Sequence, residues 1–95
     1  MLFVKICGIT RLEDALLAAE LGADAIGFVF FEKSPRYISL ETARHISDNL
    51  PSHVARVGVF VNPDPTQVEQ ACSVANLNAL QLHGVLSPSH VNKFA

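Results

Sequence analysis

The stretch "VARVGVFVNPDPTQVEQAC", residues Val54–Cys72, decides the fold, because it places a strand and a helix in immediate succession. Its first eight residues are mostly β-branched or otherwise apolar, which is typical of a buried strand. Asp64 then suits the N-cap of a helix, and Pro65 suits the first helical position, where its missing N–H is harmless. The apolar residues that follow predict an inward-facing helical stripe, made of Val68, Ala71, Cys72 and Ala75.

The same unit recurs along the chain. Further strand-like runs occur at Leu2–Cys7, Ala25–Phe30 and Ala79–His83. Alternating strands and helices imply a parallel sheet with right-handed crossovers, because a tight hairpin cannot join parallel strands. Two architectures satisfy this pattern, a doubly wound open sheet and a (β/α)8 barrel.

Two more helices are predicted between these strands. The first begins at Thr10, which forms a capping box with Glu13, and ends at Gly22. The second begins at Ser39 and stops before Pro51. Their expected inward faces are Leu12, Ala15, Leu16 and Ala19 in the first, and Leu40, Ala43, Ile46 and Leu50 in the second.

The final stretch "LSPSHVNKFA", residues 86–95, resembles the first two turns of a fourth helix, with Ser87 as cap and Pro88 next to it. Four βα units fill the 95 residues, and eight at the same pitch need roughly 200, the lower end for a (β/α)8 barrel. We therefore predict an α/β chain forming the first half of a TIM (β/α)8 barrel, with about four strands and three to four helices. Residues 1–95 are expected to be one N-terminal half-barrel, with the remainder of the barrel absent from this chain.

Composition excludes several classes of protein. The net charge is -2 and the basic residues are scattered, so no nucleic-acid partner is expected. No apolar run is long enough to span a membrane and no signal peptide is recognisable, which leaves a cytoplasmic location as the expectation. The two cysteines have neither CxxC nor metal-type spacing, so we expect reduced thiols and no metal site.

Candidate functional residues lie where each predicted strand ends, because ligands of parallel α/β folds bind outside the carboxyl ends of the strands. Cys7 has two interpretations. A lone cysteine can simply fill a small gap in the core. Alternatively, Cys7 faces a substrate that Gly8 allows to approach closely, and the following helix N-terminus favours a thiolate that acts as base or nucleophile.

Two other strand ends carry candidates. In "FEKSPRYI", Lys33 and Arg36 suit an anion, and arginine binds a carboxylate or phosphate bidentately. The alternative is a solvated loop in which Arg36 pairs with Glu32 or Glu41. His83 either contacts a ligand or hydrogen-bonds a neighbouring loop, and the structural role is the one we favour. No dinucleotide or P-loop motif is present.

Taken together, "KICGIT", "KSPRYI", "VGVFVN" and "LQLHG" resemble phosphoribosylanthranilate isomerase, a (β/α)8 barrel of tryptophan biosynthesis. The resemblance runs in order from Phe3 to Gly84 and covers the N-terminal half of such an enzyme. It implies an Amadori rearrangement of N-(5-phosphoribosyl)anthranilate to 1-(2-carboxyphenylamino)-1-deoxyribulose 5-phosphate, with no metal or organic cofactor. An acid opens the ribose ring to a Schiff base, and a base then removes the proton from C2.

The resemblance also implies roles for individual residues. Cys7 corresponds to the general base, and Arg36 to the arginine that holds the anthranilate carboxylate; Gly8 and His83 are further candidates for substrate contact. The family's general acid and phosphate-binding loops fall beyond Ala95, so the 95-residue chain alone is expected to be inactive. Its expected partners are the small phosphosugar substrate and the missing half-barrel or a second copy. The alternative function is a non-catalytic half-barrel module that self-associates or pairs with another half.

Overall fold

The computed structural model describes residues 2–84, which form four strands and three helices in strict alternation. The fourth helix predicted from Ser87 lies outside the described residues. The elements in chain order are β1 (Lys5–Cys7), α1 (Leu12–Glu20), β2 (Ala25–Val29), α2 (Leu40–Asn49), β3 (Ala55–Val61), α3 (Pro65–Ala75) and β4 (Ala79–His83).

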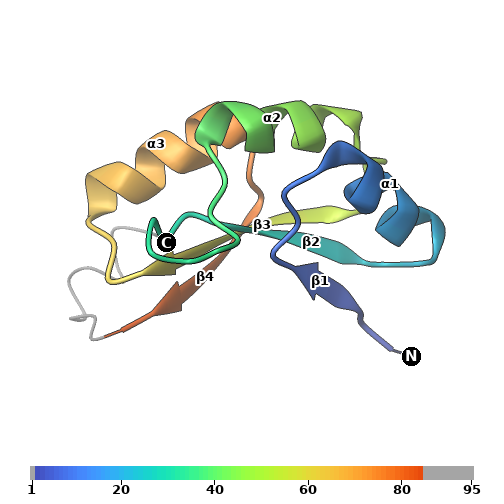
Figure 1. The fold of residues 1–95 in the computed structure, drawn as a ribbon, viewed down its shortest axis with the longest axis horizontal. Helices are drawn as coiled ribbons and strands as arrows, with labels where there is room; N and C mark the ends of the chain where they lie inside the picture. The colour runs from blue at the N-terminus through green and yellow to red at the C-terminus, as the bar shows by residue number, and fades with distance from the viewer. Residues whose placement is uncertain (1, 85–95) are drawn as a thin grey trace.

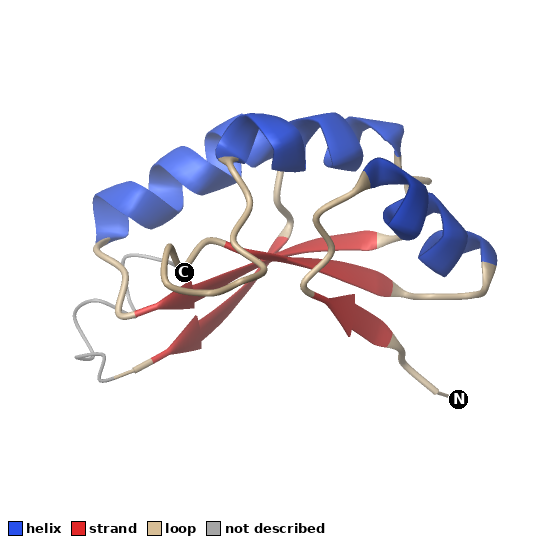
Figure 2. Cartoon of the chain, in the orientation of Figure 1, coloured by secondary structure: helices blue, strands red, loops and turns tan. Residues whose placement is uncertain are grey.

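All four strands are parallel and lie in the order β1-β2-β3-β4, so each strand pairs with its neighbours along the chain. The three helices cover the same face of this sheet, while the other face is uncovered (Figures 1 and 2). A doubly wound sheet reverses its strand order and places helices on both faces. Sequential order with one covered face is the arrangement of a (β/α)8 barrel, and it excludes the open-sheet alternative.

The two faces of the sheet divide the side chains by their parity along each strand. Toward the helices, Ile26, Phe28 and Phe60 are fully buried and pack in one core with residues of α2 and α3 such as Ile46 and Val68. The opposite face carries the other set, which is smaller or more polar. Across the sheet, that set is arranged in rows such as Cys7–Gly27–Val57–Ala79 and Val29–Val59–Gln81.

Two of the predicted helix starts are confirmed. The Ser39 hydroxyl accepts a hydrogen bond from the Thr42 backbone N–H at 3.2 Å, and the Asp64 carboxylate accepts one from the Gln67 N–H at 2.8 Å. Pro65 occupies the first turn of α3 as expected. In both helices the cap side chain accepts from an N–H of the first turn, which has no partner within the helix, and the helix begins at the residue after the cap.

The predicted capping box of α1 is wrong. The N-cap is Arg11 and not Thr10, and no side chain caps this helix. The Glu13 carboxylate forms an ion pair with Arg11 instead of reaching back to the backbone of Thr10. The pKa of the Glu13 carboxyl lies below its ordinary value, because the carboxylate accepts from the backbone N–H of Glu13 and because the Arg11 guanidinium bonds to it. The stripe on α1 also shifts, since Ala15 is fully buried whereas Leu16 is 40% exposed.

The first strand is shorter than predicted, because ladder pairing with β2 begins only at Lys5. Val4 precedes the strand, where its N–H donates to the Asp24 carboxylate at 2.7 Å and its carbonyl accepts from the Asp24 N–H at 2.8 Å. Leu2 and Phe3 are 87% and 73% exposed. Their apolar character predicted a strand, but within residues 2–84 β1 is an edge strand with a neighbour on one side only.

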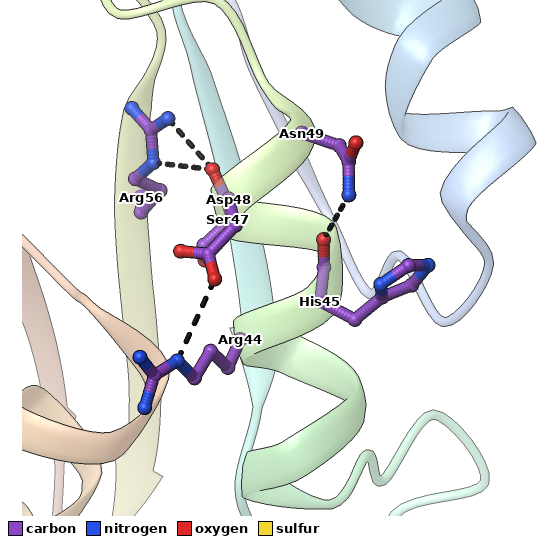
Figure 3. A network of polar contacts seen from close by, with 6 residues as sticks. All are labelled: Arg44, His45, Ser47, Asp48, Asn49 and Arg56. Carbon is purple, nitrogen blue, oxygen red and sulfur yellow. Dashed lines mark hydrogen bonds and ion pairs between the residues drawn. The ribbon is translucent and has the colours of Figure 1, made fainter.

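A buried arginine joins α2 to the sheet. Arg56, at the start of β3, is only 8% exposed, and it donates to carbonyls at the end of α2 (Figure 3). Its Nε and Nη2 donate to the Ser47 carbonyl at 3.1 and 2.7 Å, and Nη2 also donates to the Leu50 carbonyl at 3.0 Å. Nη1 donates to the Val54 carbonyl at 2.7 Å. A cation at a helix C-terminus satisfies carbonyls that have no partner within the helix and opposes the negative end of the helix dipole.

We predict that Arg56→Met lowers the free energy of unfolding by about 3 kcal/mol, because three buried carbonyls lose a charged donor. The measurement is urea-induced unfolding of the full-length polypeptide that carries this chain. Arg56→Lys keeps the charge but loses the planar fork, so its loss should be smaller. A loss below about 0.5 kcal/mol for Arg56→Met would contradict this account.

Ser47→Ala is the matched control in the same place. Within residues 2–84 the Ser47 hydroxyl is buried and has no hydrogen-bond partner, so its removal costs nothing that the fold uses. We expect unchanged or slightly higher stability, by up to about 1 kcal/mol.

Candidate active site

The predicted site residues lie at one edge of the sheet, where the strands end and the loops toward the helices begin. Cys7 is the last residue of β1 and His83 the last residue of β4. Parallel strands deliver their carboxyl ends to the same edge, so a site there is built from several loops at once. Cys7 and His83 end the two outer strands and are therefore not neighbours in the ladder.

The position of Cys7 is set by a glycine on the neighbouring strand. Cys7 pairs with Gly27 in the β1–β2 ladder, and the Gly8 N–H donates to the Gly27 carbonyl at 3.0 Å. A Cβ on Gly27 would lie 3.1 Å from the Cys7 Sγ, which is tighter than ordinary contact. Among the described residues the thiol is exposed, and it lies on the face of the sheet away from the helices. Gly27 did not enter the predicted site, although a glycine inside a strand often marks close approach.

Gly8 lies beneath the side chain of Arg36. The φ angle of Gly8 is +85°, and a Cβ added there would lie 2.2 Å from the Arg36 Cδ. The aliphatic part of Arg36 therefore rests on the Gly8 backbone, next to Cys7 in sequence. The structure thus brings together three of the four predicted residues, from the ends of β1 and β2.

The loop backbone holds Arg36 in place at the other end. Its N–H donates to the Ser34 hydroxyl at 3.1 Å, and the Tyr37 N–H donates to the Ser34 carbonyl at 3.1 Å. Tyr37 forms a bridge with Val29 at the end of β2. Arg36 is exposed, and in the described part of the chain it makes no ion pair with Glu32 or Glu41. The described residues thus contain no ion pair of the kind that the solvated-loop alternative included, and the binding of an anion by Arg36 stays a prediction.

Lys33 belongs to a different part of the surface. It lines a cavity of about 500 Å³ between the loops after β2 and β3, which includes Glu32 and Asp64. Neither Cys7 nor Arg36 lines it. A second, apolar groove of about 330 Å³ lies between β1 and α1, on the helix side of Ile6 and away from the Cys7 thiol.

His83 is held by its neighbours on β4 and β3. Its Nε2 lies 2.8 Å from the Gln81 Nε2, and its carbonyl accepts from the Asn62 N–H at 2.8 Å. Gly84 follows with a φ of +108°, and a Cβ there would collide with Asn62. The Lys5 ammonium donates to the Gln81 side-chain oxygen across the uncovered face of the sheet. Sequence reasoning missed Lys5 and Gln81, because no local pattern pairs residues 76 positions apart.

Comparison with known proteins assigns this arrangement to a family. The model of the family described as N-(5'-phosphoribosyl)anthranilate (PRA) isomerase matches residues 4–95. The chain belongs to this isomerase family. Membership confirms the resemblance that the four motifs indicated. In residues 2–84 no helix is long and apolar enough to cross a membrane, and no cluster of three or more His, Cys, Asp or Glu side chains is arranged to hold a metal ion.

Relatives within the family are similar along nearly the whole chain. The N-(5'-phosphoribosyl)anthranilate isomerase of Thermotoga maritima is 62% identical over 84 residues, which are 88% of this chain and 41% of that protein. A structure of monomers generated from the dimeric isomerase of Thermotoga maritima matches 98% of this chain and 47% of its own, with a TM-score of 0.93 and 56% identity.

A third relative contains a ligand. It is a phosphoribosyl anthranilate isomerase in complex with reduced 1-(o-carboxyphenylamino)-1-deoxyribulose 5-phosphate, with a TM-score of 0.95 and 57% identity over 98% of this chain and 48% of its own. The chain thus spans a little under half the length of these relatives. Its four strands and three helices form a half-barrel, as the motif spacing predicted.

The two cysteines should differ in reactivity. We predict that iodoacetamide alkylates Cys7 faster than Cys72 at neutral pH, because only the thiolate reacts and because Cys7 is exposed. Burial on α3 raises the pKa of the Cys72 thiol, which keeps it protonated at a pH where an ordinary thiol begins to ionise.

The check is mass spectrometry of the two cysteine peptides across an alkaline pH series. The difference between them should narrow once the pH exceeds the raised pKa of Cys72, because the Cys72 thiol then ionises. Equal rates at neutral pH would contradict the burial of Cys72.

Proposed function

We propose that the full-length protein containing this chain is a phosphoribosylanthranilate isomerase of tryptophan biosynthesis. Its reaction is then the Amadori rearrangement of N-(5-phosphoribosyl)anthranilate to 1-(2-carboxyphenylamino)-1-deoxyribulose 5-phosphate. The observation that carries the proposal is the placement of the Arg36 stem on Gly8, the residue that follows the exposed Cys7 in the sequence. Family membership supplies the substrate class, and one relative is in complex with the reduced form of this product.

In this proposal Cys7 is the general base. After an acid has protonated the ribose ring oxygen and the ring has opened to a Schiff base, the Cys7 thiolate takes the proton from C2. The electron pair of that C–H bond forms the enolamine, which tautomerises to the ketone. The exposed position of Cys7 on the uncovered face supports this role, since a base has to reach the proton it removes.

Arg36 binds the anthranilate carboxylate in the same proposal. A guanidinium presents two parallel N–H donors to a carboxylate, and Arg36 is exposed without an ion pair among the described residues. Gly8 supports it by admitting the arginine stem against the backbone. His83 is a further candidate for contact with the substrate, and it lies at the end of β4, on the same edge of the sheet.

In this proposal the acid and the phosphate-binding groups come from the rest of the barrel, since the chain spans 41% and 48% of two relatives. We therefore propose that residues 1–95 act only together with the rest of the barrel, as its N-terminal half, and that the isolated chain is inactive. The apolar groove beside β1 and the unpaired edges of β1 and β4 support such completion, by the missing half or by a second copy. A non-catalytic half-barrel module is not favoured, because the relatives carry the name of an enzyme. A cytoplasmic location is part of the proposal and agrees with two free thiols.

We predict that Cys7→Ala lowers kcat of the full-length enzyme on the order of 100-fold or more, because the base that removes the C2 proton is lost. The assay is product formation under saturating substrate. Cys72→Ala is the matched control, since Cys72 is half-buried on α3 and remote from the sheet edge, and its kcat should stay close to wild type. Activity of Cys7→Ala within a few-fold of wild type would end the assignment of Cys7.

We also predict that Gly8→Ala raises KM, because its Cβ would displace Arg36. Gly22→Ala separates this effect from backbone strain, since Gly22 also has a positive φ, +101°, but no atom within 4 Å of an added Cβ. Both variants should lose about 1–2 kcal/mol of stability, and only Gly8→Ala should bind substrate more weakly. Similar KM values for the two variants would show that Arg36 does not depend on Gly8.

A further inference from the structure

The uncovered face of the sheet carries a row of polar side chains that leads to His83, and the proposed chemistry assigns no role to its other two members, Lys5 and Gln81. Lys5 on β1 donates to the Gln81 side-chain oxygen on β4, and the Gln81 amide nitrogen lies 2.8 Å from the His83 Nε2. Lys5 and Gln81 come from the two outer strands of the sheet, so this contact spans the whole uncovered face. The neighbours of Lys5 along its row are Ala25 and Ala55, which have short side chains, and Ala25 is fully buried.

The donors and acceptors of these three side chains allow one orientation of the Gln81 amide. A lysine ammonium has three donors and no acceptor, so it bonds only to the amide oxygen. The amide nitrogen is thereby directed to His83, and an amide nitrogen has no acceptor either. The His83 Nε2 must accept, because a proton on Nε2 would point at the amide N–H. The ring proton is therefore on Nδ1.

We propose that Lys5 and Gln81 are positioning residues that hold His83 in its neutral Nδ1–H tautomer. In residues 2–84 the Nδ1 has no hydrogen-bond partner, and the ring is exposed at the end of β4. His83 thus presents an uncharged donor of fixed orientation at the sheet edge where ligands of this fold bind. Its partner is an oxygen acceptor of the substrate, such as a sugar hydroxyl, and this last step rests on the proposed function.

The tautomer can be read directly from long-range ¹⁵N–¹H correlation spectra of the histidine rings in the full-length protein. We expect His83 to show the Nδ1–H pattern. His45 and His53 are exposed and their rings make no hydrogen bond within residues 2–84, so they provide internal references and show that each variant is folded. A wild-type His83 protonated at Nε2 would overturn the proposal.

Gln81→Glu is the decisive variant. A carboxylate accepts from Lys5 and from His83, so the proton should move to Nε2 while the side-chain volume stays nearly the same. Gln81→Met removes both bonds, and the His83 pattern should then approach that of His45. An unchanged Nδ1–H pattern in Gln81→Glu would refute the role of Gln81.

Lys5→Met tests the contact between Lys5 and the Gln81 amide. Without the ammonium the amide of Gln81 is free to turn, and the His83 pattern should change from one tautomer to a mixture. An unchanged spectrum would show that Lys5 does not fix the amide. No enzyme assay is needed for this part, so failure of the tautomer assignment is distinguishable from failure of the proposed function.

The link to the substrate is measured separately. If Nδ1–H donates to bound substrate, Gln81→Glu should raise KM roughly tenfold with a smaller change in kcat. A switched tautomer with unchanged KM would refute the substrate contact and leave the positioning role standing.

Discussion

The structure depends on the hand of its strand–helix–strand crossovers, which is the same in every repeat. A right-handed crossover that always advances to the next position in the sheet places each helix on the same side as the one before. This single constraint produces the sequential strand order, the one-sided helix layer and the common edge at which all four strands end. Cys7 and Arg36 come together because of it, since their loops follow neighbouring strands.

The two faces of the sheet carry different kinds of side chain. The helix side is dense and apolar, and within residues 2–84 its one buried charge is Arg56, which donates to three carbonyls at the end of α2 and in the loop that follows. On the uncovered face the small residues Ala25, Gly27 and Ala55 leave room for longer polar neighbours. Among the described residues the main apolar core therefore lies on the helix side of the sheet, whereas the other face is the one that lines the inside of a (β/α)8 barrel.

Much of the fold could be predicted from the sequence, because the responsible signals are local. The caps Ser39 and Asp64 and the apolar stripes of α2 and α3 act within one or two turns. The capping box at Thr10 failed because Glu13 found a stronger partner in the arginine two residues away. The overlong first strand failed because apolar residues before Lys5 have a sheet neighbour on one side only.

The candidate site was predictable in position and less so in composition. Strand ends are visible in a sequence, so Cys7, Gly8, Arg36 and His83 could be found there. The contact of Lys5 with Gln81, and the gap that Gly27 leaves for the thiol, depend on strand register, which the sequence does not state.

The support beneath Arg36 has a consequence for how such a site changes over generations. The arginine stem rests on the backbone of Gly8, and its own N–H is held by the Ser34 hydroxyl. At the Gly8 end, the position of the Arg36 side chain therefore depends on a single glycine. Almost any substitution at Gly8 would add a Cβ that displaces the Arg36 side chain, so this position tolerates little besides glycine.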